Sequence, residues 1–309
     1  THSREWVRNL LNTLSESMNV AKVEEAGIQL KEQIDHRPLG DEWSAVHKHF
    51  ASWARAGAIE AVLKALQNHV RSSALAVTCV EVLAHLSRCS WSRYMVTTTG
   101  AQKIVKLGGI TTVLNVMELN MSEGFFNSAL LQEEGCRLLW NLAQAHLEYR
   151  TKIAKSDGVA KILEAMDLHI DHPGVQHRGC GALANLASNA NRTKFIPLKT
   201  DEGGGVSPAA TNSIQDRGAI PRILRALDHH PDHAGVQECA CCALRNIAFW
   251  DQRTIRDLGG IERVEKAVAL SSASALTKKA GQDLLDMLEN IDTPGAKNSQ
   301  PAGCLAGLF

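Results

Sequence analysis

The chain has 309 residues, and its 33 lysines and arginines balance its 33 aspartates and glutamates, so its formal net charge is zero. Such a chain has no excess of positive charge with which to hold a nucleic-acid backbone or an acidic membrane. It contains no run of apolar residues long enough to span a bilayer, and its N-terminus lacks the charged-then-apolar layout of a secretory signal. We therefore expect an intracellular protein, cytoplasmic or also nuclear, that binds no nucleic acid and inserts into no membrane.

One apolar pattern recurs along the chain, with apolar residues at i, i+3, i+4 and i+7, which form one face of a helix. The copies run from Val7 to Leu14, Ile59 to Leu66, Ile110 to Met117, Val159 to Met166 and Ile220 to Leu227, with a degenerate copy from Ile261. A chain built from similar repeats of about 40 to 60 residues is an array, and an array is more often a binding surface than a catalytic pocket.

Each copy is followed by a polar turn and by a second, longer helix that ends in a recurring phrase. The phrase is Leu-Leu-Trp-Asn-Leu-Ala at 138–143, Ala-Leu-Ala-Asn-Leu-Ala at 182–187 and Ala-Leu-Arg-Asn-Ile-Ala at 243–248. A short third helix leads to the next repeat and is expected to stop at glycine, as in 151–158 and 253–260, since glycine enters the left-handed conformation without steric cost. The sequence therefore predicts three helices per repeat.

Two inserts and a tail interrupt this pattern. The repeat that opens at Ile110 holds additional residues near 122–128, between its two main helices. The larger insert, 198–213, is rich in Gly, Ser, Pro and Asp, which is typical of a mobile surface loop, and such a loop could gate a binding site. The last repeat carries Met287 where its neighbours carry Asn, as a terminal cap would, and residues 292–309 are expected to form a flexible tail.

Three features of the repeats resemble armadillo repeats. They are the Gly-Ala-Ile or Gly-Gly-Ile openings, the Val-Gln pairs that begin long helices at 175 and 236, and the Ala-Leu-x-Asn-Leu-Ala phrases. The resemblance covers residues 3–291. It implies an all-α, right-handed superhelix, an α-solenoid of about six three-helix repeats that open near residues 7, 59, 110, 159, 220 and 261, with long inserts between helices.

The Asn of the recurring phrase is the main candidate for function. In armadillo proteins its helix lines the concave wall, so the resemblance implies that Asn141, Asn185 and Asn246 clamp the backbone of an extended peptide. The chemistry fits, because an amide offers a donor and an acceptor to any peptide unit. The alternative is that these side chains satisfy backbone groups between repeats and bind no ligand.

Neighbouring positions on the same helix face would then select the ligand, and they hold Trp140, Arg137, Arg245, Gln144, Ser188 and Phe249. Importin-type armadillo proteins carry a Trp four residues before the Asn. This chain has no Trp there, which argues against a nuclear-import adaptor. Arg137 and Arg245 favour a peptide of acidic or phosphorylated character. The alternative is that both arginines are ion-pair partners.

The histidines and cysteines predict no metal site, and no cofactor is expected. His169 and His172 match His230 and His233 one repeat later, so repetition explains the cluster, and turn or capping roles are expected. Most of the eight cysteines lie in apolar helical stretches, as reduced, buried thiols would. Since no serine is framed by a catalytic elbow and no glycine run by a phosphate-binding motif, we expect no enzyme.

The sequence therefore predicts a non-catalytic scaffold or adaptor that binds a protein partner, as an extended peptide or a helix, in its concave groove. One alternative is that the array is the recognition or regulatory part of a larger protein that also carries a kinase, ligase or motor function. Another is a structural subunit that assembles through its convex face or its ends. The oligomeric state does not follow from the sequence.

Overall fold

A computed structural model describes residues 4–35, 43–88, 90–92, 95–97, 99–121, 128–188, 207–270 and 273–289. The chain divides into two compact units, residues 1–145 (unit 1) and residues 146–309 (unit 2). The single array expected for residues 3–291 stays a prediction. The expected tail at 292–309 lies outside the described residues.

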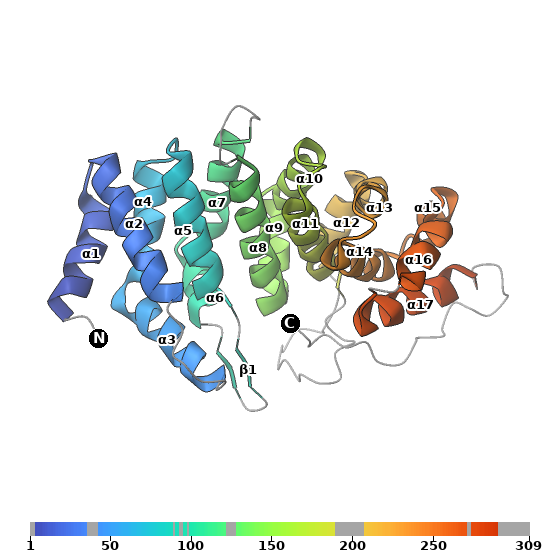
Figure 1. The fold of residues 1–309 in the computed structure, drawn as a ribbon, viewed down its shortest axis with the longest axis horizontal. Coiled ribbons are helices and arrows are strands. Elements are labelled where there is room, and N and C mark those ends of the chain that lie inside the picture. The colour runs from blue at the N-terminus through green and yellow to red at the C-terminus, as the bar shows by residue number, and fades with distance from the viewer. Residues whose placement is uncertain are drawn as a thin grey trace. The chain divides into compact units, whose positions relative to one another are not determined.

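Unit 1 holds three repeats, whose helices follow one another in Figure 1. The first helices are α1 (Arg4–Glu16), α4 (Ala58–Asn68) and α7 (Gly109–Leu119), the long helices are α2 (Val20–Asp35), α5 (Ser73–Leu86) and α8 (Ser128–Ala145), and the connecting helices are α3 (Trp43–Ala56) and α6 (Thr99–Lys106). Helices of the same kind pack together, α1 on α4 and α4 on α7, then α2 on α5 and α5 on α8. Unit 1 therefore has a layer of first helices and a layer of long helices.

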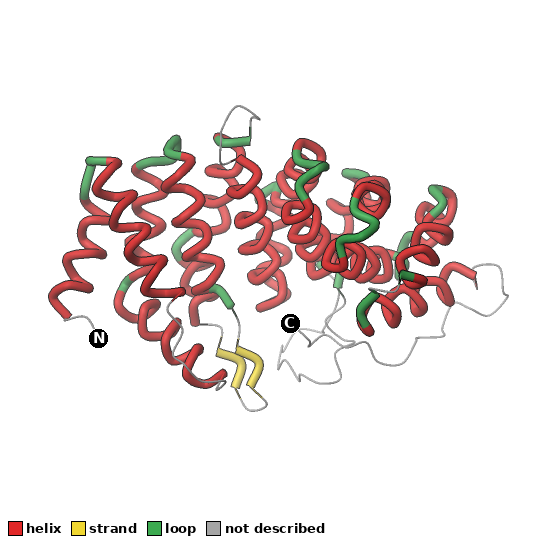
Figure 2. The backbone as a smooth tube through the Cα atoms, viewed as in Figure 1, coloured by secondary structure: helices red, strands yellow, loops and turns green. Residues whose placement is uncertain are grey.

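Unit 2 repeats the same plan. Its first helices are α10 (Gly158–Leu168), α13 (Ala219–His229) and α16 (Gly260–Ala269), its long helices are α11 (Pro173–Leu186), α14 (Ala234–Ile247) and α17 (Ala275–Glu289), and its connecting helices are α9 (Leu147–Lys155), α12 (Pro208–Asp216) and α15 (Gln252–Asp257). Here α11 packs on α14 and α14 on α17. The six repeats confirm the predicted all-α solenoid of three-helix repeats, and Figure 2 shows how helices dominate the described chain.

The recurring apolar pattern forms the core of both units. Ile59 of a first helix and Leu83 and Leu244 of long helices have no exposed surface. Burying one such side chain contributes about 1.5–3 kcal/mol relative to leaving it in water. Because the close-packed core cannot fully collapse into a cavity, truncating Leu83 or Leu244 to Ala would cost about 2–5 kcal/mol.

Histidines cap two long helices of unit 2. Nδ1 of His172 accepts the backbone N–H of Val175 at 3.3 Å, and Nδ1 of His233 accepts that of Val236 at 3.1 Å. Each ring thus satisfies one of the backbone donors that a helix start leaves without an intrahelical partner. The capping role expected for this histidine cluster is therefore confirmed.

The junction between a connecting helix and the next first helix departs from the expectation in one detail. The left-handed residue before α16 is Gly259 (φ 73°), and before α10 it is Asp157 (φ 65°), so neither Gly260 nor Gly158 ends a connecting helix. Gly158 instead begins α10, where a Cβ would lie 2.8 Å from the carbonyl oxygen of Ile153. At the junctions before α10 and α16, Gly158 and Gly260 therefore allow a close approach and do not supply a positive φ, whereas the same position before α4 and α13 holds Ala58 and Ala219.

Two other elements were not expected. Strands β1 (Ser90–Ser92) and β2 (Met95–Thr97) pair antiparallel, with Trp91 opposite Val96. In the insert predicted to be a loop over 198–213, residues 208–213 belong to helix α12, which is capped by Ser207 and packs on α9. Ala210 and Ile214 of this helix are buried. That end of the insert is helical because α12 is the connecting helix of its repeat. The rest of the insert, 198–206, and the shorter insert, 122–127, lie outside the described residues.

Candidate functional site

The candidate site is the long-helix layer of each unit, which is α2, α5 and α8 in unit 1 and α11, α14 and α17 in unit 2. Side chains four or seven residues apart on a helix share one face, so the positions around the recurring Asn form a row on each long helix. Each unit therefore has its own set of candidate side chains.

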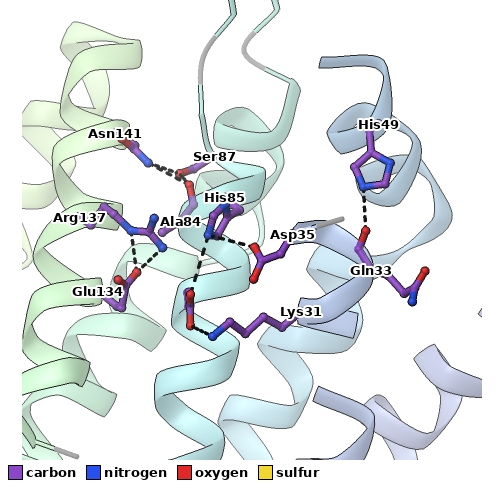
Figure 3. A network of polar contacts seen from close by, with 11 residues as sticks. Lys31, Gln33, Asp35, His49, Ala84, His85, Ser87, Glu134, Arg137 and Asn141 are labelled. Carbon is purple, nitrogen blue, oxygen red and sulfur yellow. Dashed lines mark hydrogen bonds and ion pairs between the residues drawn. The ribbon is translucent and has the colours of Figure 1, made fainter. Parts of the chain in front are cut away.

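In unit 1, Asn141 of α8 lies over the C-terminal end of α5. Its Nδ2 donates to the carbonyl oxygen of Ala84 at 2.9 Å and to Oγ of Ser87 at 3.1 Å, as Figure 3 shows. The carbonyl of Ala84 is available because the last four carbonyls of a helix have no intrahelical partner. Asn141 is half-buried, and its Oδ1 accepts no hydrogen bond from the described part of the chain. One side of this amide is therefore fixed, and its acceptor faces outward.

In unit 2, Asn246 of α14 makes the same structural contact. Its Nδ2 donates to the carbonyl oxygen of Ala184 in α11 at 2.8 Å. Its Oδ1, however, accepts a hydrogen bond from Nη2 of Arg245 at 3.2 Å. Asn185 of α11 is half-buried. The Nδ2 groups of Asn141 and Asn246 thus satisfy backbone carbonyls between repeats, which is the alternative that the sequence left open. Contact of their Oδ1 atoms with a peptide stays a prediction.

Both candidate arginines are held in ion pairs. Nε of Arg137 donates to Oε2 of Glu134 at 2.6 Å, and Nη1 of Arg245 lies 3.8 Å from Oδ2 of Asp283. Only 18% of the Arg137 side chain and 11% of the Arg245 side chain are exposed. The structure thus places both residues in the ion-pair role that the sequence left as an alternative. Their charges are already offset, so neither supports recognition of an acidic or phosphorylated peptide.

A polar network that sequence reasoning missed links α2 to α5. Lys31 Nζ lies 2.7 Å from Glu81 Oε2, and His85 Nε2 lies 3.5 Å from Asp35 Oδ1 (Figure 3). His85 occupies the Asn position of its repeat, and Glu81 lies one turn before it. The spacing of Lys31 from Asp35 and of Glu81 from His85 could have shown that each pair shares a helix face, because the two residues are four apart.

Glu134 is a carboxylate of this network whose pKa is perturbed. Burial raises its pKa above the ordinary value, the charge of Arg137 lowers it, and the charges of Glu81 and Glu133 raise it again. The combined effect is a raised pKa, so the neighbouring cation does not offset the loss of hydration and the nearby negative charges.

The remaining candidate residues are half-buried or exposed. Trp140 and Gln144 in unit 1 and Ser188 in unit 2 are half-buried, and Phe249 is exposed over 36% of its surface. The carbonyl of Ser188 accepts a hydrogen bond from Nη1 of Arg150, a buried residue of α9. Arg150 was not predicted, because the contact joins elements far apart in the sequence.

Thiols and metal ligands offer no separate site in the described ranges. The six described cysteines are thiols, and burial raises the pKa of Cys79, Cys136 and Cys241 to about 12, which keeps them protonated. No three His, Cys, Asp or Glu side chains converge within those ranges as a metal ion would require. Nor does any helix there combine the length and apolar composition of a membrane span.

Comparison with known proteins finds one relative by sequence and several similar solved structures. Protein aardvark of Dictyostelium discoideum is 30% identical over 144 residues, which are 46% of this chain and 17% of that protein, so the chain spans less than a fifth of that relative's length. An engineered protein solved by the Northeast Structural Genomics Consortium has a TM-score of 0.66 and 21% identity, with 92% of this chain and 96% of that chain covered.

The designed armadillo repeat protein YIII(Dq.V1)4CPAF, in complex with the peptide (KR)4, has a TM-score of 0.65 and 16% identity, with 91% of this chain and 99% of that chain covered. At these identities the two structures show the fold alone. A family model described as the LRRK2 ARM repeat matches residues 60–268, well over half of the chain. The chain therefore belongs to the LRRK2 ARM repeat family of armadillo repeats.

Proposed function

We propose that this protein is a non-catalytic interaction scaffold that holds an extended segment of a partner protein on the long-helix layer of unit 1. The observation that carries the proposal is Asn141. Its Nδ2 is fixed on Ala84 and Ser87, while its half-buried Oδ1 accepts no hydrogen bond from any described residue. A peptide N–H could bind this oxygen whatever its side chain, which is how an array recognises a backbone.

The fixed side of the amide favours binding. Because its Nδ2 is already bound, the Asn141 side chain loses little rotamer freedom when it accepts a peptide N–H. One such hydrogen bond contributes about 0.5–1.5 kcal/mol net. Asn141 would therefore position the backbone, and Trp140, Arg137 and Gln144 around it would supply most of the contact area.

Unit 2 offers a second contact area in this proposal, with Asn185, Asn246, Arg245, Ser188 and Phe249. Phe249 is exposed and could receive an apolar side chain of the partner. Asn246 contributes less than Asn141, because Arg245 occupies its acceptor.

Two further observations support the proposal. A designed armadillo repeat protein of similar fold was solved in complex with a peptide, which supports peptide binding by this architecture. Six cysteine thiols in the described residues support a role in the cytoplasm or nucleus, where thiols stay reduced.

Peptides selected on the whole chain from a random twelve-residue display library would test the proposal. Their affinities are measured calorimetrically for the wild type, Asn141→Ala and Asn141→Asp. Asn141→Ala should weaken binding about tenfold, since it removes the acceptor. Asn141→Asp keeps an acceptor oxygen but loses the donor to Ala84, so it should lower the melting temperature while affinity changes less.

A variant at the matching position of unit 2 distinguishes a loss of binding by Asn141→Ala from a folding defect. Asn246→Ala removes the same inter-helix donor in unit 2, where the acceptor is already occupied, and should therefore weaken binding far less than Asn141→Ala does. If Asn141→Ala binds the selected peptides as well as the wild type does, the proposed surface is wrong.

A further inference from the structure

The long helices of the two units differ in charge. In unit 1, α2, α5 and α8 carry seven carboxylates and three cations, a formal charge of −4 with histidine neutral. In unit 2, α11, α14 and α17 carry four carboxylates and four cations, a formal charge of zero. The chain as a whole is neutral, so the acidity of unit 1 is local to its long-helix layer.

Three of these carboxylates lie in the network beside Asn141. Asp35 is 40% exposed, Glu81 is 20% exposed and Glu134 is 16% exposed, and Figure 3 shows Asp35 and Glu134 on either side of α5. The cations that pair with them within the layer are Lys31 and Arg137. The carboxylates therefore stay partly open to a partner.

The charges around Glu134 indicate that this surface lacks positive charge. Glu134 lies seven residues before Asn141, two turns along the same face of α8. Burial and the neighbouring charges of Glu81 and Glu133 raise its pKa despite the ion pair with Arg137. A second cation brought to this place would stabilise the ionised carboxylate, whereas a second anion would be repelled.

Apolar side chains flank the carboxylates. Leu130 lies one turn before Glu134 on α8 and is 48% exposed, and Ile28 lies one turn before Lys31 on α2 and is 51% exposed. Single exposed apolar residues are common on protein surfaces, but these two share helix faces with the carboxylates, so an apolar side chain of the same partner could pack on them.

We infer that the partner segment held by the long-helix layer of unit 1 is basic, with a lysine or arginine that binds between Glu81 and Glu134 and an apolar residue that packs on Leu130. This inference rests on the proposed function, because it places the segment backbone on Asn141. The basic side chain reaches the carboxylates from the backbone position that Asn141 fixes. An acidic segment or a nucleic-acid backbone meets the wrong charge on this layer.

Three labelled twelve-residue peptides test the inference on the whole chain. They share Leu and Ser residues and differ at every third position, which is Lys, Gln or Glu. We expect the Lys peptide to bind about tenfold more tightly than the Gln peptide in low salt, with the difference shrinking as salt screens the charges. Fluorescence anisotropy gives the affinities, and circular dichroism checks the fold of each variant.

Matched variants locate the effect. Glu134→Gln and the more exposed Asp35→Asn should each weaken the Lys peptide about three- to tenfold and leave the Gln peptide unchanged. Glu16→Gln on α1 changes the net charge equally outside the layer and should have no effect. Asp35→Asn keeps the test decisive if Glu134→Gln disturbs the packing of Arg137.

The outcomes separate the inference from the proposed function. If the Gln or Glu peptide binds as tightly as the Lys peptide and Asn141→Ala still weakens that binding, the basic partner is wrong and the scaffold proposal stands. If none of the three peptides binds the folded chain, or if Asn141→Ala changes none of the affinities, both are wrong.

Discussion

Asn141 and Asn246 occupy the same position in units 1 and 2, and they make the same structural contact in different surroundings. Each Nδ2 donates to a carbonyl of the preceding long helix, at 2.9 Å for Ala84 and 2.8 Å for Ala184. The preceding residue differs, however, and Arg245 donates to the Oδ1 of Asn246. The position in the repeat therefore fixes the partner of the Asn donor, while the residue that precedes the Asn decides whether its acceptor stays open.

The largest expected effect is a loss of stability when a buried glutamine that anchors a turn is replaced, and it should differ between the two units. Gln237 of unit 2 donates to the carbonyls of Leu227 and His230, whereas Gln132 of unit 1 donates to that of Met117. Gln237→Leu removes the side-chain donor of the Leu227 carbonyl, which costs about 1–3 kcal/mol, and one of two donors to the His230 carbonyl, which still accepts the N–H of His233, at about 0.5–1.5 kcal/mol. Gln237→Leu should therefore destabilise the protein by about 2–4 kcal/mol and Gln132→Leu by less. Urea denaturation followed by circular dichroism measures both. Equal losses would mean that the second carbonyl contact contributes nothing.

The next prediction changes the residue that directly precedes Asn141 or Asn246. Trp140→Arg places before Asn141 the residue that covers Asn246, so it should close the acceptor and weaken the selected peptides about tenfold. Arg245→Ala should change those affinities much less than Trp140→Arg does, because it opens the acceptor of unit 2 and leaves that of Asn141 as it is. Calorimetric titration gives both values. Unchanged binding by Trp140→Arg would contradict the role assigned to the neighbour.

A pH dependence should arise in unit 2 from the fifth residue of α11, His177, where α5 of unit 1 has Val77. Burial, with smaller effects from the charges of Arg178 and His233, lowers the pKa of His177 to about 4. Between about pH 6.5 and pH 4 the unfolded chain binds a proton that the folded chain does not, so stability falls as pH falls through this window. It levels off below pH 4.

Urea midpoints at pH 7, 5.5 and 4 check this expectation against His177→Gln. The variant should lose part of the decline between pH 6.5 and 4, because it has no proton to take up at this position. The same slope in both proteins would show that other groups cause the decline.

The smallest effect concerns thiol reactivity. Cys136 of unit 1 and Cys241 of unit 2 hold the same repeat position, and burial raises the pKa of each to about 12. Cys242, which replaces the Arg137 of unit 1, is half-buried. Iodoacetamide should therefore modify Cys242 at least about tenfold faster than the other two, since the accessible thiolate is the nucleophile. Mass spectrometry of digests resolves the three sites, and equal rates would contradict the burial of Cys136 and Cys241.

The periodic parts of the fold could be predicted from the sequence. Helices α4 and α13 begin one residue before Ile59 and Ile220, the residues that open their apolar patterns. Local rules suffice there, because an apolar face repeated at helical spacing has one way to reach the core. The hairpin at 90–97 escaped prediction because its strands of three residues are too short to carry a period.

Only part of the candidate site could be predicted. The positions of Asn141 and Asn246 follow from the repeated phrase, yet which carbonyl each amide binds depends on how neighbouring helices pack. The ion pair of Lys31 with Glu81 crosses between α2 and α5, so no local spacing reveals which residues pair. Asp157 adopts the left-handed conformation that was expected of a glycine. Asparagine and aspartate can also enter this conformation.

Asn141 and Asn246 each donate to a main-chain carbonyl, a group that every amino acid carries. A repeat that is duplicated, deleted or exchanged therefore meets the same acceptor in its new neighbour, whatever the sequence of that neighbour. The contact between repeats and the choice of ligand are then under separate selection. Such an array can lengthen, shorten or change its partners over evolution without redesigning its joints.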